Sequence, residues 1–315
     1  MIQRRRATAA LAAALVGLPA FAQAQQEIYI PLVSKGFQHQ FWQAVKSGAE
    51  QAAKDLKVKV TFEGPETEAM VDKQIDMLAA ALAKKPQAIG FAALDSQAAI
   101  PLLKKAQAAK IPVVAFDSGV DSDIPVTTTT TDNKAAAALA ADKMAEMIGK
   151  SGEVALVVHD QTSRTGVDRR DGFVNRIKSA YPNIKIVSVQ YGGGDQLKST
   201  EITKSILQAS PNLKGIFGAN EGSAIGVVNG VKEMKRSGKV VIIGYDSGKQ
   251  QKNAIMDGSM AGAITQNPVG MGYKTVEMAV KAIKGEKLPK VVDSGFFWYD
   301  KTNIADPKIA SVLYD

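Results

Sequence analysis

The feature that most constrains this chain is the alternation of short apolar runs with longer amphipathic segments. The stretch over residues 28–42 begins with an apolar, β-branched run that is typical of a strand buried on both faces of a sheet. Gly36 interrupts this run, and apolar residues then recur at helical spacing from Phe41 to Ala52. A strand, a loop and an amphipathic helix therefore follow one another, which is the repeating unit of a parallel α/β sheet.

The same alternation continues along most of the chain. Further strands are predicted over residues 58–62, 88–92, 113–116, 127–131, 154–158, 184–189, 215–219, 240–244 and 261–265. Helices are predicted over residues 70–84, 100–109, 133–148, 173–180, 202–209, 224–234, 250–256 and 270–283. This order predicts an α/β fold of doubly wound, Rossmann-like parallel sheets with right-handed crossovers.

The first 24 residues are organised like a secretory signal peptide. Arg4, Arg5 and Arg6 form a positive segment, residues 9–18 are mostly apolar, and an A-x-A cleavage site occurs at 20–22 or 22–24. The apolar stretch is shorter than the ~18 residues that a membrane span needs, and no later segment reaches that length. The chain has no Cys, which excludes disulfides and argues against a lipid anchor. We therefore expect residues 1–24 to be removed and the mature chain to be soluble in a Gram-negative periplasm.

The charge of the chain argues against a nucleic-acid-binding function, and its length predicts two domains. The formal net charge of +8 falls to about +5 when the three Arg of residues 1–24 are removed. Lys and Asp or Glu are interspersed, and no basic run with aromatic residues between its charges indicates a nucleic-acid partner. The roughly 290 residues that remain are enough for two domains, each with its own core.

A weak internal repeat places polar residues at corresponding strand ends. Residues 114–119 and 243–248 are both apolar runs that end in an aromatic followed by Asp-Ser-Gly, and residues 91–96 resemble residues 217–222. Any one such residue is typical of a helix cap or a turn. In two facing α/β halves, however, these strand ends lie around one cleft. The residues expected there are Asp95, Asp117, Asn220 and Asp246.

The loop after the first strand combines aromatic and polar side chains. Its residues are Lys35, Gln38, His39, Phe41 and Trp42, and they lie where parallel sheets bind small ligands. Flat apolar rings beside hydrogen-bonding groups suit a sugar, which has a C–H face and peripheral hydroxyls. The alternative that Phe41 and Trp42 only begin the core face of the helix stays open.

Several short motifs, in this order, resemble one known family. They are Phe41-Trp42 with residues 46–49, then residues 94–96, 111–114 with Asp117, 131–133, 169–173, 219–221, 244–246 and 265–268. No single motif is specific, but their order and spacing over nearly the whole mature length resemble the periplasmic sugar-binding proteins of the ribose/galactose type. That family serves ABC transporters and has the type I periplasmic binding protein fold.

The resemblance implies two lobes joined by a three-segment hinge. The crossovers would fall near Asp132, near Gln266 and within residues 291–294. The N-terminal lobe would comprise residues 25–130 and 267–292, and the C-terminal lobe residues 131–266 and 293–315. The lobes would close on a monosaccharide, a pentose or a hexose, and deliver it to the permease subunits of the transporter.

The resemblance also assigns binding roles to individual residues. His39 and Trp42 would belong to the first loop of the site, Asp95 and Arg169 to the partners of the sugar hydroxyls, and Asn220, Asp246 and Gln266 to the second lobe. Carboxylate, guanidinium and amide groups together can pair several hydroxyls. The chain departs from the family pattern at Ser96, at Arg170 and at residues 192–194, so the identity of the sugar stays open.

Other functions are weaker interpretations of the same sequence. With two His and no Cys, we expect no metal site and no cofactor. An enzyme acting on a sugar or nucleoside, with Asp95 and Asp246 as acid and base, remains an alternative. A polyol, inositol or furanosyl signalling molecule could replace the sugar, and a chemoreceptor is a further candidate partner. A sugar-responsive regulator would need a DNA-binding segment where the signal peptide stands. We expect a monomeric, non-enzymatic receptor.

Overall fold

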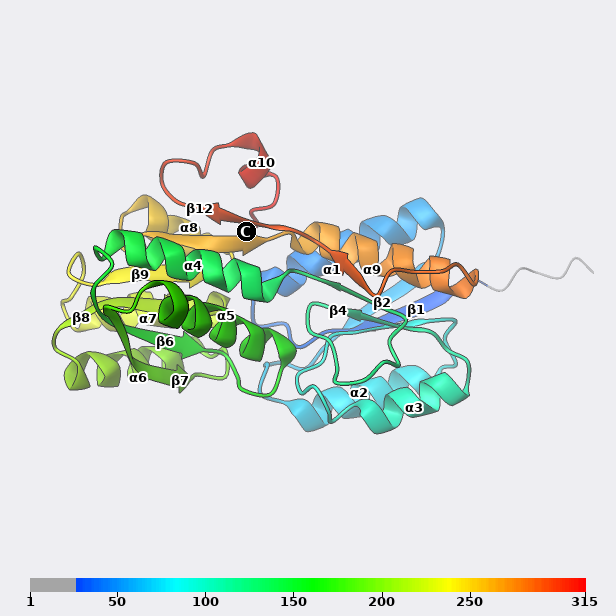
Figure 1. Ribbon diagram of the computed structural model, residues 1–315. Helices are drawn as coiled ribbons and strands as arrows, with labels where there is room; N and C mark the ends of the chain where they lie inside the picture. Colours follow the sequence, from blue (N-terminus) through cyan, green and yellow to red (C-terminus); the bar gives the residue numbers. More distant parts are fainter. Residues whose placement is uncertain (1–26) are drawn as a thin grey trace, which may run out of the picture.

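The computed structural model describes residues 27–315, and the predicted signal peptide lies outside them. Its strands form two six-stranded sheets, in the orders β11-β5-β4-β3-β1-β2 and β12-β10-β9-β8-β6-β7 (Figure 1). All neighbouring strands in the described part are parallel except β10 and β12, which are antiparallel. Each sheet has helices on both faces, so the predicted doubly wound α/β architecture is confirmed.

The first lobe contains the first sheet and the helices that cover it. Its elements are β1 (Tyr29–Val33), α1 (Gln40–Leu56), β2 (Lys59–Glu63), α2 (Val71–Ala83), β3 (Ile89–Phe91), α3 (Ile100–Ala108), β4 (Val113–Phe116), β5 (Thr127–Thr130), α9 (Pro268–Ile283) and β11 (Val291–Asp293). Consecutive residues Leu32 and Val33 of β1 belong to two apolar clusters, one on each face of the sheet. Helices α1 and α9 cover one face, and α2 and α3 cover the other.

The second lobe repeats this plan. Its elements are α4 (Asn133–Met147), β6 (Gly152–Val158), α5 (Arg164–Ala180), β7 (Ile184–Tyr191), α6 (Gln196–Ala209), β8 (Leu213–Gly218), α7 (Glu221–Glu233), β9 (Val241–Tyr245), α8 (Lys249–Met256), β10 (Gly262–Gln266), β12 (Phe296–Tyr299) and α10 (Pro307–Ala310). Leu156 and Val157 of β6 again divide between two clusters. Helices α4 and α5 pack on one face of the sheet, and α6, α7 and α8 on the other.

Two glycines bring α1 and α9 close together. A Cβ atom on Gly48 of α1 would lie 1.9 Å from the carbonyl oxygen of Val269, and one on Gly272 of α9 would lie 1.9 Å from the carbonyl oxygen of Val45. No other residue fits at either position without moving a helix. This contact fixes α1 firmly, and α1 begins at the loop where a ligand site is predicted.

The chain passes between the lobes three times (Figure 1). The passages join β5 to α4, β10 to α9, and β11 to β12. Asp132 caps α4 by accepting a hydrogen bond from the Ala135 N–H, Gln266 ends β10, and Ser294 follows β11. The passages therefore lie where the crossovers are expected. The exact lobe boundaries stay a prediction, and β11 already retains Asp293, which that prediction assigned to the second lobe.

The sequence did not predict β11, β12 or α10, and among the predicted elements the largest error in bounds is the start of α5. The prediction begins this helix at residue 173, but it starts at Arg164, where the Ser163 hydroxyl accepts a hydrogen bond from the Gly166 N–H. The missed segment is polar and contains two glycines, so it lacks apolar periodicity. Helix α6 likewise begins earlier, after its cap Asp195. Among the described residues, no helix is long and apolar enough to cross a membrane.

Candidate ligand-binding site

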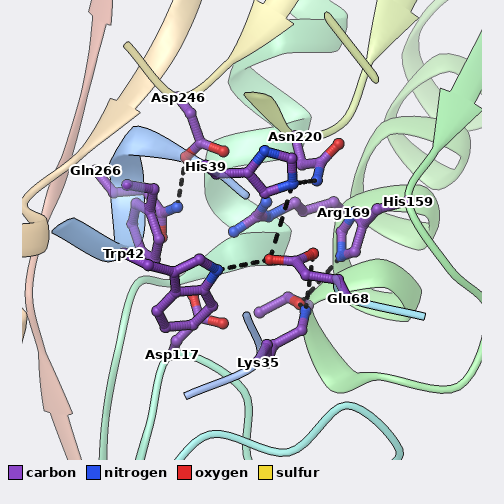
Figure 2. Close-up of a pocket in the computed structure, with 12 residues that line it drawn as sticks. Lys35, His39, Trp42, Glu68, Asp117, His159, Arg169, Asn220, Asp246 and Gln266 are labelled. Atoms are coloured by element: carbon purple, nitrogen blue, oxygen red, sulfur yellow. Dashed lines mark hydrogen bonds and ion pairs between the residues drawn. The ribbon is translucent and has the colours of Figure 1, made fainter. Parts of the chain in front are cut away.

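A narrow cavity of about 10 Å³ lies between the two lobes, at the carboxyl ends of strands from both sheets. The side chains around it are mostly polar or charged (Figure 2). They are Lys35, His39, Phe41, Trp42, Glu68, Asp117, His159, Thr165, Arg169, Asn220, Asp246 and Gln266. The structure thus brings together all the predicted site residues except Asp95, and of the first-loop residues only Gln38, which accepts a hydrogen bond from the Glu68 N–H, does not line the cavity.

Asp117 and Asp246 occupy matching positions in the two lobes. Asp117 follows β4 with φ 56°, and Asp246 follows β9 with φ 81°. The backbone N–H of Asp117 donates to the Thr129 carbonyl at 2.9 Å, and that of Asp246 donates to the Ile264 carbonyl at 2.6 Å. Asp tolerates this left-handed conformation better than most residues, because its short polar side chain can bond locally. The repeated Asp-Ser-Gly motif therefore turns one carboxylate of each lobe to the cavity.

Arg169 is a fixed cation of the second lobe. Its side chain is 3% exposed, Nε donates to Asn133 Oδ1 at 2.8 Å, and Nη1 donates to the Ala219 carbonyl at 3.0 Å. The guanidinium lies 3.8 Å from the ring centre of Tyr245, whose hydroxyl donates to the same Asn133 oxygen. Burial lowers the pKa of Arg169, but Tyr245 and the cavity carboxylates outweigh it and raise the pKa. Arg169 lies in the second turn of α5.

The other second-lobe residues form a connected network. Asp246 Oδ1 accepts from Gln266 Nε2 at 2.7 Å (Figure 2). Its Oδ2 accepts from the Glu221 N–H at 3.0 Å. Asn220 caps α7 by accepting from the Ser223 N–H, and its Nδ2 lies 3.4 Å from His39 Nε2 of the first lobe. The buried atoms Gln266 Oε1 and His39 Nδ1 have no hydrogen-bond partner among the described residues. These atoms can pair with a ligand.

In the first lobe, Trp42 holds a buried carboxylate. Its Nε1 donates to Glu68 Oε1 at 2.7 Å, while Lys35 Nζ lies 3.9 Å from Glu68 Oε2 (Figure 2). The Trp42 ring is 1% exposed and contacts Phe41 and Phe116 edge to face. Phe41 and Trp42 therefore belong both to the core and to the cavity wall. Stacking of Trp42 on a ligand stays a prediction.

Glu68, His159 and Thr165 line the cavity but were not selected from the sequence. Burial raises the pKa of Glu68, but Lys35 and His39 outweigh burial and lower it, so the carboxyl is ionised. Burial lowers the pKa of His159 to about 3, so its ring is neutral at pH 7, with Nε2 3.1 Å from Thr165 Oγ1. Glu68 lies in an irregular loop and does not directly follow a strand, so the strand-end argument did not select it. Thr165 lies in the part of α5 that was not predicted as a helix. The position of His159 after β6 was the one available signal.

Asp95 lies outside the cavity lining, contrary to the prediction. Its Oδ1 accepts hydrogen bonds from the N–H groups of Gln97 and Ala98, at 2.8 and 2.9 Å. Its carboxylate is thus used by the turn before α3, which is the local role that strand-end Asp residues often have. Asp117 and Glu68 are the first-lobe carboxylates that face the cavity instead.

The fold and the site define the class of this protein. Two doubly wound lobes with three connections and a polar cavity between them form a bilobal ligand-binding protein. Over residues 30–287 the sequence matches the family model described as a periplasmic binding protein domain, and the chain belongs to that family. The resemblance predicted from the sequence motifs is thereby confirmed. Among residues 27–315, no group of three or more His, Asp or Glu residues is arranged to hold a metal ion.

Known relatives cover most of the chain. The D-allose-binding periplasmic protein of Escherichia coli (strain K12) is 29% identical over 282 residues, which is 87% of this chain and 90% of that protein. An ABC transporter solute-binding protein from Agrobacterium vitis with bound D-fucose has a TM-score of 0.88 at 34% identity, covering 91% of this chain and 100% of that one. A carbohydrate transporter solute-binding protein from Agrobacterium radiobacter in complex with D-arabinose has a TM-score of 0.88 at 33% identity, covering 92% and 100%.

Proposed function

We propose that this protein is the solute-binding component of an ABC importer and that it binds a monosaccharide, a pentose or a hexose, between its lobes. The observation that carries the proposal is a buried cavity in which both lobes contribute donors and acceptors, some of them without a partner in the protein. These include Gln266 Oε1 and His39 Nδ1, and the Asp117 carboxylate also lines the cavity. Ligands named for relatives are D-allose, D-fucose and D-arabinose.

The cavity chemistry supports a small polyhydroxylated ligand. A carboxylate accepts from vicinal hydroxyls, an Arg donates through a planar fork, and an amide does both. The free space in the cavity is about 10 Å³, which is room for about one water molecule, so a monosaccharide can enter only when the lobes separate. A micromolar dissociation constant equals about −8.2 kcal/mol, or about −0.7 kcal/mol for each of roughly 12 heavy atoms, which is within the known ceiling. Ligand burial from both lobes would favour the closed state and shift the protein toward it.

In this role the protein makes and breaks no covalent bond of its ligand. Its partners are the permease subunits of the importer, and a chemoreceptor is a further partner within the same proposal. The mature protein would be a monomer in the periplasm after loss of residues 1–24. N-terminal sequencing of protein from the native host, with size-exclusion chromatography of the periplasmic fraction, tests cleavage and monomeric state together. A sequence that starts at Met1 would refute the signal peptide.

The ligand is identified by native mass spectrometry of protein purified without denaturation. Calorimetry then measures binding of D-allose, D-ribose, D-fucose, D-arabinose and D-tagatose, with myo-inositol as a polyol. We expect micromolar or tighter binding of at least one monosaccharide. Mass analysis after prolonged incubation should recover that sugar unchanged. Recovery of a modified sugar would support the enzyme alternative, and binding of only the polyol would refute the monosaccharide assignment.

A further inference from the structure

The carboxylate of Glu221 crosses from the second lobe to the first. Glu221 is the first residue of α7 and does not line the cavity. Its Oε1 accepts a hydrogen bond from the Gln40 N–H at 3.1 Å, and its Oε2 accepts from the Phe41 N–H at 3.2 Å. Gln40 and Phe41 are the first two residues of α1. One side chain of the second lobe therefore pairs two backbone groups at the start of a first-lobe helix.

Helix α1 has no cap of its own in the first lobe. Its N-cap residue, His39, makes no capping hydrogen bond with its side chain, and its first turn contains no acidic residue. The first N–H groups of a helix have no partner within the helix, and the helix dipole makes this end positive. An anion with two hydrogen-bond acceptors satisfies both requirements, and Glu221 supplies it from the facing lobe.

A second cap runs in the opposite direction. Gln40 Oε1 of α1 accepts a hydrogen bond from the Lys249 N–H, the first residue of α8, at 2.7 Å. The N-cap residue of α8 is Gly248, which has no side chain for this purpose. A Cβ atom there would lie 2.8 Å from Gln40 Oε1 and 3.0 Å from the Glu221 carboxyl carbon, so a larger residue would displace the two capping side chains. Each lobe thus caps a helix of the other.

The reciprocal caps adjoin the cavity without entering it. The backbone N–H of Glu221 donates to Asp246 Oδ2, and Phe41, whose N–H is capped, lines the cavity. Separating the lobes breaks both caps and returns the start of α1 to water. The caps therefore stabilise only the closed arrangement of the lobes, and they are separate from the cavity side chains that we propose as ligand contacts.

We propose that Glu221 is a positioning residue that sets ligand affinity by capping α1 when the lobes close. This inference rests on the proposed function, because it assumes a ligand held between closing lobes. Glu221 acts on the equilibrium between open and closed lobes, and the ligand gains affinity in proportion to the closed fraction. It contributes to how tightly sugars bind and not to which sugar is preferred.

The test compares Glu221→Ala and Glu221→Gln with the wild type. The matched control is Glu233→Ala, because Glu233 is an exposed Glu at the other end of α7. For the tightest sugar of the panel, we expect the dissociation constant to rise about tenfold in Glu221→Ala and about threefold in Glu221→Gln, which keeps one acceptor oxygen. The backbone bond to Asp246 persists in both variants. Thermal unfolding establishes that each variant is folded.

A ligand-free measurement separates this inference from the proposed function. The chain has no Cys, so the changes Met70→Cys and Leu197→Cys give two unique spin-label sites, both exposed, one on each lobe. Without sugar, Glu221→Ala should shift the label distances toward longer values relative to the wild type and to Glu233→Ala. If no sugar binds the wild type, the proposed function fails while this measurement still tests the cap.

Two results would overturn the inference. One is an unchanged dissociation constant together with an unchanged distance distribution in Glu221→Ala. The other is a changed order of affinities for D-allose, D-fucose and D-arabinose, because that would place the effect inside the cavity. A rise in the dissociation constant that is uniform across the sugars, with a more open ligand-free state, supports it.

Discussion

Asp117 and Asp246 lie at equivalent strand ends, but their carboxylates differ in the hydrogen bonds that they accept. Asp246 accepts two hydrogen bonds from its own lobe, from Gln266 Nε2 and the Glu221 N–H. The Asp117 carboxylate has no hydrogen-bond donor among the described residues, and burial raises its pKa to about 6. The second lobe therefore presents a preorganised carboxylate, and the first lobe presents one that a ligand must satisfy.

The next strand of each sheet explains the difference. The N–H of Asp117 pairs with Thr129 and that of Asp246 with Ile264, so Thr131 in the first lobe corresponds to Gln266 in the second. Gln266 is long enough to reach the Asp246 carboxylate. The Thr131 hydroxyl instead lies 3.1 Å from the Ser294 hydroxyl, where the chain crosses between lobes. The difference between Gln266 and Thr131 thus accounts for one of the two donors of Asp246, and the other, the Glu221 N–H, comes from α7.

Removing the preorganised carboxylate of Asp246 should have the largest effect on sugar affinity. Asp246→Ala removes the acceptor that we propose for the ligand and leaves Gln266 Nε2 and the Glu221 N–H unpaired in a buried site. Losing one member of a buried charged network costs ~3–5 kcal/mol, so we expect sugar affinity to fall at least ~100-fold. Calorimetry measures the loss, and the exposed Asp257→Ala serves as the control. A loss of less than about fivefold would show that this carboxylate does not contact the ligand.

Replacing the carboxylate of Asp117 should weaken sugar binding but stabilise the ligand-free protein. Asn keeps the shape of Asp117 and tolerates its positive φ. We expect Asp117→Asn to reduce sugar affinity about tenfold, because an accepting oxygen is replaced by a donor. At pH 7 the ligand-free variant should be more stable than the wild type by up to about 3 kcal/mol, which corresponds to the raised pKa.

The stability difference between Asp117→Asn and the wild type should depend on pH. The pKa of Asp117 rises from its usual 3.8 to about 6 in the folded protein. The contribution of the Asp117 carboxyl to the free energy of unfolding is therefore fully present below pH 3.8, and it is lost as the pH rises through 6. Denaturant unfolding at pH 4, 5, 6 and 7 should show the stability difference between Asp117→Asn and the wild type growing over this range. A difference that does not depend on pH would contradict the assignment.

A smaller effect is expected at the other first-lobe carboxylate. Trp42→Phe keeps a ring in the core but removes the hydrogen bond from Nε1 to Glu68. A buried acceptor that loses its donor costs ~1–3 kcal/mol of stability, and we expect sugar affinity to fall only about threefold. Any sugar-induced change of fluorescence that comes from Trp42 should disappear, with Trp298→Phe as the control because the chain has only two Trp. If the change persists in Trp42→Phe and disappears in the control, Trp298 is its source.

The smallest effect on binding is expected at Asp95. Asp95→Ala removes a turn contact outside the cavity, so the dissociation constant should change less than about twofold. Stability should fall by ~0.5–2 kcal/mol, as for other local side-chain caps. Calorimetry and thermal unfolding measure the two quantities. A tenfold loss of affinity would show that Asp95 does contribute to ligand binding.

The sequence alone determined the order of strands and helices up to α9 and the strand-end positions of Asp117, Asn220 and Asp246, but it did not predict β11, β12 or α10. These features are local: they depend on apolar period, on chain breaks at glycine and on a short repeated motif. The same local argument failed for Asp95, because a strand-end Asp can equally well hold its own turn. It also missed the start of α5, where a cap and tertiary packing replace apolar periodicity.

Only the tertiary structure decided which groups face one another across long stretches of chain. Glu68 reaches Trp42 over 26 residues, and Glu221 reaches Gln40 over 181. Neither residue differs in type from the exposed acidic residues around it in the sequence, so no pattern distinguishes it. Burial and distance, which give these carboxylates their pairing and their charge state, exist only once two lobes with separate cores have packed against each other.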